Sequence, residues 1–222
     1  MTDPVILLAE DQLPTLSERR AARVRWALDH VGLEPTDARY QADLYPHDPP
    51  SRRRALAIAQ SGCGIADEAA WEAAGVRVLG YEIGYDLRAT GRGVPVVTNV
   101  IEMARRAGAW RQPNAVTVAL PLPGDALIMG CSSCLGVWGR GGFSGEHVSI
   151  VVACVRQNAG NAYDAHGIDG GQPGIHPRSR SLVWRGPELW AASLTDGGYA
   201  LGDDGRPTRG RRVLGWVDAD AL

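Results

Sequence analysis

The sequence contains no lysine, only four cysteines and no long apolar run. Arginine therefore supplies every positive side chain apart from any protonated histidine, which we interpret as a compositional bias and not as part of a mechanism. No apolar run approaches the roughly 20 residues of a membrane-spanning helix, so we expect no membrane segment. Four cysteines in 222 residues are too few for a disulfide scaffold.

The chain also lacks a strong net charge. It has 23 basic and 25 acidic residues, which gives a formal net charge of -2. This balance gives no overall basic field to attract nucleic acid or an anionic membrane, so we expect neither as a partner. The first ten residues lack the basic stretch of a signal peptide, and Glu10 and Asp11 interrupt their apolar run. We therefore expect a cytoplasmic protein by default, unless a signal-independent route exports it.

Glycine and proline are concentrated in the second half of the chain. Most of the 28 glycines and 14 prolines lie from Gly91 onward, where they alternate with short β-rich runs. This distribution predicts an N-terminal helical half followed by a half of strands and turns, which is an α+β organisation. Since no internal repeat or low-complexity linker divides the chain, we expect a single domain over residues 1–222. Its helical half covers about 1–112 and its β-rich half about 113–222.

Apolar periodicity and capping residues locate the expected elements. Helices are expected over 13–31, 51–60, 63–74 and 95–107, with a connecting loop over 34–50. Ser17 has the side chain of an N-cap within the first of these. Strands are expected over 115–122, 126–130, 146–155, 162–168, 181–184, 189–193 and 212–217, with a turn over 123–125. The run over 146–155 is the longest one rich in β-branched residues and is expected to be central in the sheet.

Cys63 lies between Gly62 and Gly64 at the start of an expected helix. At this position its sulfur is close to unpaired backbone N–H groups and to the positive end of the helix dipole, which favour the thiolate. A thiolate is the reactive form of a cysteine nucleophile. The alternative is a small apolar side chain that packs beneath the helix.

Two downstream residues have the chemistry that such a nucleophile needs. His147 begins the expected central strand, and Asp169 follows the next strand along the chain. A thiol mechanism requires a histidine that takes the thiol proton and a third polar group that orients the imidazole. Neighbouring antiparallel strands could bring these two side chains together. The alternatives are a solvated histidine at a strand end and an ordinary Asp-Gly-Gly turn.

The segments 123–130 (PGDALIMG), 146–151 (EHVSIV) and 168–172 (IDGGQ) carry a family resemblance. In this order, behind a cysteine that opens a helix, they resemble the papain-like bacterial cell-wall hydrolases of the NlpC and CHAP types. The resemblance spans roughly residues 60–172. It implies a papain-like fold, in which N-terminal helices pack on a C-terminal antiparallel β-sheet.

The same resemblance implies roles for the residues. Cys63 would be the nucleophile of a cysteine peptidase or amidase, His147 the general base and then acid, and Asp169 the orienting residue. Gln172 is a second candidate for the third role and is otherwise expected to contact substrate. The implied substrate is an amide bond in a peptidoglycan stem peptide or crosslink. This mechanism requires no metal and no cofactor.

Tyr81 and Tyr85 lie in the loop that follows the Cys63 helix. Together with Arg88 of the same loop, these tyrosines could line a substrate cleft. The alternative is a solvated loop with no part in binding.

Two other classes of function remain open. The aromatic residues of the C-terminal part could stack on sugar rings in a non-catalytic module that binds cell wall or glycan, although core packing also explains them. These residues are Trp184, Trp190, Tyr199 and Trp216. Cys131 and Cys134 have the spacing of a redox pair in a thiol oxidoreductase, but the glycine-rich run after them predicts a loop where such a motif needs a helix.

Overall fold

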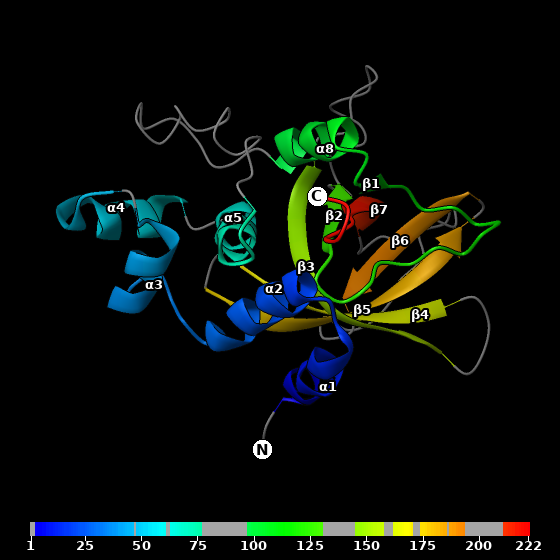
Figure 1. Ribbon diagram of the computed structural model, residues 1–222, viewed down its shortest axis with the longest axis horizontal. Coiled ribbons are helices and arrows are strands. Elements are labelled where there is room, and N and C mark those ends of the chain that lie inside the picture. The colour runs from blue at the N-terminus through cyan, green and yellow to red at the C-terminus, as the bar shows by residue number, and fades with distance from the viewer. Residues whose placement is uncertain are drawn as a thin grey trace, which may run out of the picture.

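In a computed structural model the chain forms an antiparallel β-barrel with helices packed around it (Figure 1). The structure describes residues 3–46, 48–60, 63–76, 97–130, 145–157, 162–170, 174–185, 187–193 and 211–222. Within these ranges every α-helix precedes residue 107 and every strand follows residue 109. This confirms the expected α+β class with helices first and an antiparallel sheet behind them.

The described α-helices are α1 Pro4–Gln12, α2 Glu18–Asp29, α3 Ala38–Leu44, α4 Pro50–Gln60, α5 Cys63–Ala73 and α8 Val97–Arg106. Ser17 caps α2 as predicted, because its side chain accepts a hydrogen bond from the backbone N–H of Arg20. The predicted single helix over 13–31 is wrong at its beginning, where Leu13–Thr15 form a 3-10 turn. Among the described residues, no helix combines the length and the apolar character that crossing a bilayer requires.

The sequence did not predict two of these helices. In α1, Asp3 caps the first turn by accepting from the N–H of Val5, and Pro4 occupies the first helical position. Helix α3 falls within the predicted 34–50 loop. Its residues Tyr40 and Leu44 are four apart and both buried, so one face of this short helix packs into the core.

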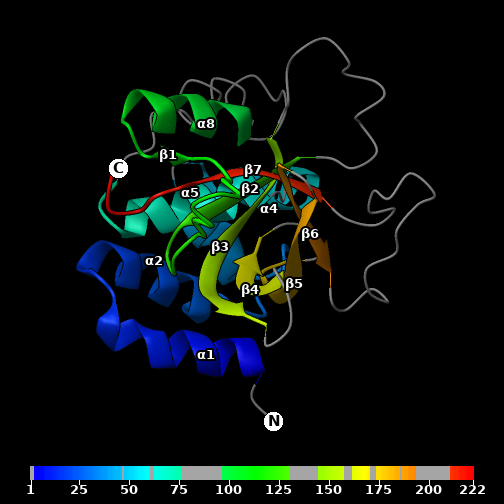
Figure 2. The ribbon, with the colours of Figure 1, turned by 90° about the vertical axis from the view of Figure 1, so that its right-hand side faces the viewer.

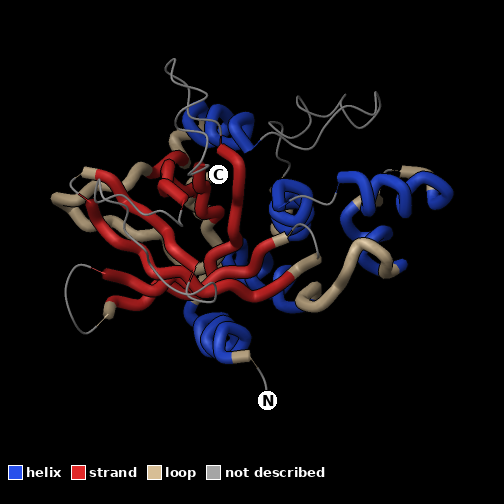
Figure 3. The backbone as a smooth tube through the Cα atoms, turned by 180° about the vertical axis from the view of Figure 1, so that it is seen from behind, coloured by secondary structure: helices blue, strands red, loops and turns tan. Residues whose placement is uncertain are grey.

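The described strands are β1 Trp110–Arg111, β2 Ala126–Gly130, β3 Gly145–Arg156, β4 Ala162–Asp169, β5 His176–Arg185, β6 Glu188–Ser193 and β7 Arg211–Val217. Their order in the sheet is β1-β7-β2-β3-β4-β5-β6, and β7 also pairs with β6, so six strands close into a barrel. Figure 2 shows α8 on one flank of the barrel and α1 with α2 on the other. Figure 3 shows the strands on one side of the molecule and α3, α4 and α5 on the opposite side.

The strand predicted over 115–122 does not form. Strand β2 is already paired with β3 on one side and with β7 on the other, so no edge of β2 is open to this segment. The side chain of Asn114 instead accepts hydrogen bonds from the N–H groups of Val116 and Thr117 and holds a local turn. Val116 is accordingly 92% exposed despite its high β propensity.

The two faces of the barrel wall have different surroundings. Residues directly opposite each other on paired strands project to the same face of a sheet. Met129 pairs with His147 and Leu127 pairs with Ser149, and both apolar partners belong to the buried cluster inside the barrel. The alternate residues, such as Val148, pack outward against helices α5 and α8. His147 and Ser149 therefore lie on the inner face.

A buried ion pair connects α2 to α5. The guanidinium of Arg23 donates to Asp67, and its central carbon lies 3.4 Å from the ring centroid of Trp71. The indole N–H of Trp71 donates to the other oxygen of Asp67 at 3.0 Å. Because Arg23, Asp67 and Trp71 are all buried, the pair fixes how α5 lies against α2.

The turn over 123–125 also has a structural role. Asp125 accepts hydrogen bonds from Arg20 at 2.7 Å, from the N–H of Leu122 at 2.7 Å and from the N–H of Ala219 at 2.9 Å. Gly124 has φ +87°, and a Cβ there would lie 2.8 Å from the Cα of Arg20. The Pro-Gly-Asp turn therefore joins α2 to the C-terminal residues, and glycine is required for the close approach.

Candidate functional site

His147 and Asp169 are neighbours on the inner face at one end of the barrel. Ile150 of β3 pairs with Ile168 of β4, which places Asp169 on the same face as His147 and Ser149. The Nε2 atom of His147 lies 2.7 Å from Oδ2 of Asp169. The predicted proximity of these two side chains is thus confirmed, while their chemical roles remain predictions.

Arg180 of β5 completes the cluster, and the sequence did not reveal it. Its Nη1 donates to Oδ1 of Asp169 at 3.2 Å, its Nη2 donates to Oδ2, and Nη1 also lies 3.3 Å from Oγ of Ser149. The side chains of His147, Asp169 and Arg180 are 19%, 9% and 12% exposed. The predicted strand began at residue 181, so Arg180 fell outside it. Alternation back from the buried Leu182 would have placed Arg180 on the same face.

Asp169 is held in its ionised form. Burial raises the pKa of this carboxyl group, but the charge of Arg180 and the hydrogen bond from His147 lower it more strongly, so the net pKa lies well below its usual value. An ionised carboxylate can only accept hydrogen bonds, and hence His147 donates its Nε2–H to Asp169. In the neutral imidazole this leaves Nδ1 without a proton, which makes Nδ1 the basic atom of the ring.

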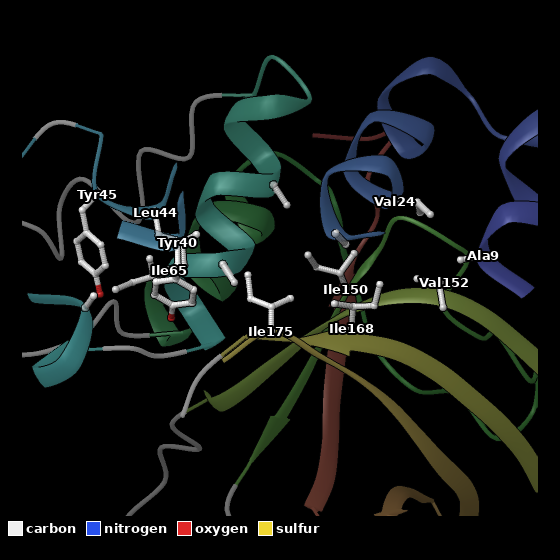
Figure 4. Close-up of a cluster of buried hydrophobic side chains, with 14 of the residues drawn as sticks. Ala9, Val24, Tyr40, Leu44, Tyr45, Ile65, Ile150, Val152, Ile168 and Ile175 are labelled. Atoms are coloured by element: carbon white, nitrogen blue, oxygen red, sulfur yellow. The ribbon is translucent and has the colours of Figure 1, made fainter. Parts of the chain in front are cut away.

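Helix α5 begins at Cys63, as the sequence predicted. The side chain of Cys63 lies outside the described part of the structure. Helix α5 packs against β3, and Ile65 in its first turn belongs to the same buried cluster as Ile168 and Ile175. Figure 4 shows Ile175 between Ile65 on one side and Ile168 on the other. Since Ile168 directly precedes Asp169, the first turn of α5 lies near the barrel end that carries the His147–Asp169 pair.

Several predicted site residues fall outside the described ranges. These are Tyr81, Tyr85, Cys131, Cys134, Gln172 and Tyr199. Trp190 and Trp216, by contrast, are buried in the barrel wall, so core packing accounts for both of them.

Cys154 of β3 is a free cysteine with an unreactive thiol. Burial, with a contribution from the charge of Asp164, raises its pKa to about 12. At neutral pH this thiol therefore stays protonated, which makes it a useful internal reference for the reactivity of Cys63.

No cluster of three or more His, Cys, Asp or Glu side chains suited to a metal ion occurs among the described residues. The chain matches no protein-family model, no curated protein and no solved structure.

Proposed function

We propose that the protein is a cysteine hydrolase of papain-like fold that cleaves an amide bond through Cys63, His147 and Asp169. The observation that carries the proposal is the hydrogen bond of 2.7 Å between His147 and Asp169. It assigns the imidazole tautomer that a general base requires. The start of α5 at Cys63, near the same end of the barrel, supports a nucleophile at that position.

In the proposed mechanism Nδ1 of His147 takes the proton of the Cys63 thiol, and the sulfur attacks the carbonyl carbon of the amide. The C–N bond then breaks, the imidazolium returns its proton to the leaving amine, and a thioester remains on Cys63. His147 next takes a proton from water, the resulting hydroxide attacks the thioester, and the acid product leaves as the thiol is restored. The backbone N–H of Cys63 would be one donor to the oxyanion.

The position of Cys63 suits this role electrostatically. The first residues of a helix leave backbone N–H groups without intrahelical partners and are at the positive end of its dipole. Both features stabilise a thiolate and so lower the pH at which the thiol ionises. The 11-residue helix α5 is held in its middle by the buried contacts of Asp67 and near its C-terminal end by those of Trp71.

The proposed substrate is an amide bond in a peptidoglycan stem peptide or crosslink. The support is the order of the three segments 123–130, 146–151 and 168–172 behind Cys63. In the structure the first of these acts in folding through Asp125, while the other two carry His147 and Asp169. Peptides and peptidoglycan fragments are therefore the substrates to test first.

The nucleophile is tested by substitution of Cys63. We expect Cys63→Ala to abolish hydrolysis of peptidoglycan-derived peptides, with a loss of at least about 1000-fold, while the circular dichroism spectrum stays the same. Cys154→Ala is the matched control and should retain activity, because that thiol has no part in the mechanism. Equal activity of the Cys63→Ala variant and the parent protein would refute the assignment.

Alkylation tests the thiolate without any substrate. In a Cys131→Ser, Cys134→Ser background, Cys63 should react with iodoacetamide at pH values well below the ~8.5 at which an ordinary thiol ionises. Cys154 should stay unmodified over this range, since its pKa is about 12. An ordinary profile for Cys63 would favour a non-catalytic binding module. Loss of activity in the background itself would favour the thiol oxidoreductase.

A further inference from the structure

Four residues on three neighbouring strands form a connected set of contacts that ends at Asp169, the hydrogen-bond partner of His147. Asp169 and Gly167 belong to β4, Ser149 to β3 and Arg180 to β5. A Cβ at position 167 would clash with Oγ of Ser149 and would lie 3.1 Å from the backbone oxygen of Ile150. The absence of a side chain at Gly167 therefore makes room for the hydroxyl of Ser149, which accepts a hydrogen bond from Arg180.

Arg180 is held on two sides. Its Nη1 donates a hydrogen bond to the buried hydroxyl of Ser149, and both of its terminal nitrogens donate hydrogen bonds to the carboxylate of Asp169. Such a two-point arrangement fixes the plane of the carboxylate as well as its distance. The terminal nitrogen Nη2 also lies 3.5 Å from Nε2 of His147. Since both of these atoms donate to Oδ2 of Asp169, the carboxylate can neither rotate nor move without losing one of them.

We propose that Arg180 is a positioning residue for the candidate catalytic pair, holding Asp169 so that it aligns His147 while cancelling most of its negative charge. Within the described residues, Arg180 lies against Nε2 of His147 and not against the proposed basic atom Nδ1, so it acts through Asp169. The Arg180–Asp169 pair as a whole is electrically neutral, so it orients the imidazole as an uncharged side chain would. This assignment depends on the proposed role of His147 as general base.

The charge balance has a consequence for His147. A lone carboxylate beside an imidazole stabilises the imidazolium, whereas the neighbouring positive charge of Arg180 opposes that effect. On this face the neighbouring strands carry Asp169 of β4 together with Arg180, Arg178 and His176 of β5, the last two directly opposite Gly167 and Asp169. The same inner face also carries the ionisable side chains of Cys154, Arg156, Tyr163 and Arg211. Arg178 makes no ion pair within the described part of the chain and is two residues from Arg180 on the same face, so it is the matched control.

The experiment is an NMR titration of the full chain with isotope-labelled histidine, in which His147→Gln assigns the His147 signal among five histidines. The test variants are Arg180→Met, Arg180→Lys and Arg178→Met. Removal of the Arg180 charge should raise the titration midpoint of His147 by about one pH unit or more. Arg180→Lys should shift it less, because the charge is kept. Arg178→Met should shift the midpoint by a much smaller amount than Arg180→Met and should leave the Nε2–H tautomer unchanged.

The outcomes separate this inference from the proposed function, since the titration requires no activity. A folded Arg180→Met protein whose His147 midpoint and tautomer equal those of the parent would overturn the inference, even if Cys63→Ala abolished hydrolysis. A shift of equal size in Arg178→Met would also overturn it, since a general loss of positive charge would then explain the result. If Arg180→Met does not fold, Ser149→Ala decides instead. That variant removes one support of Arg180 and should shift the midpoint upward by a smaller amount, and no shift would count against the inference.

Discussion

Two of the Arg–Asp ion pairs in the described part of the protein differ in their third residue. Arg23 and Asp67 join α2 to α5, and their side chains are 0% and 1% exposed. Arg180 and Asp169 lie at the barrel end, where the third side chain is His147 at 19% exposure. In the first pair the third side chain is that of Trp71, whose indole N–H donates to Asp67. Each cluster thus contains an Arg–Asp ion pair, and the two differ in whether the third side chain can gain or lose a proton near neutral pH.

Under the proposed function, this difference explains why the same kind of ion pair serves folding in one place and chemistry in another. An indole N–H donates a hydrogen bond but exchanges no proton near neutral pH, so the Trp71 cluster can only fix geometry. An imidazole in the same relation to a carboxylate gains and loses a proton close to neutral pH. The side chain of His147 is also partly exposed, as the proposed function requires of a residue that acts on a substrate. We therefore expect the first cluster to control stability and the second to control activity.

The largest expected effect is on activity. Asp169→Asn should lower kcat by about 100-fold to 10,000-fold, because an amide can present the wrong group to His147 and no longer fixes its tautomer. The measurement is steady-state kinetics on a peptidoglycan-derived peptide. Asp67→Asn is the matched variant in the other cluster and should change kcat little in the protein that remains folded. Similar losses of kcat in both variants would remove the distinction between the clusters.

The next effect is on stability. Arg23→Met leaves the carboxylate of Asp67 buried without its main cation, and the free energy of unfolding should fall by about 3–5 kcal/mol. Urea denaturation followed by circular dichroism measures this change. The control is Arg39→Met, since Arg39 pairs with Asp29 on the surface, where solvent screens the interaction. Arg39→Met should leave the midpoint nearly unchanged, and a comparable loss in both variants would contradict the structural role of the Arg23–Asp67 pair.

The smallest effect is a dependence of stability on acid. The folded-state pKa of Asp169 is depressed, so its contribution to stability is complete above its unfolded-state pKa of about 4 and is lost as the pH falls toward the folded value. The loss can reach about 1.4 kcal/mol per pH unit in that range. Unfolding measured between pH 5 and pH 2.5 should therefore show a shallower acid dependence in Asp169→Asn than in the parent. Parallel curves would mean that Asp169 does not carry this linkage.

Much of the fold follows from local sequence signals. The Ser17 cap, the start of α5 at Cys63 and the strands β2, β3 and β4 agree with predictions, since each depends on a cap, on apolar periodicity or on a run of β-branched residues. Helix α3 was missed because proline and aspartate residues surround it and only Tyr40 and Leu44 mark its buried face. The segment 115–122 has a strand composition, but composition does not reveal that both edges of β2 are already paired.

The candidate site, like the fold, has features that the sequence predicts and others that only the tertiary structure shows. The sequence by itself determined which residues have the required chemistry, and their order, because a cysteine at a helix start and a histidine and an aspartate at strand ends are local features. Tertiary structure alone decided that β7 closes the barrel, that the predicted neighbours His147 and Asp169 lie on its inner face, and that Arg180 reaches Asp169 from a third strand. These facts depend on strand register and barrel closure, which arise from pairing between distant segments. No window of the sequence contains that information.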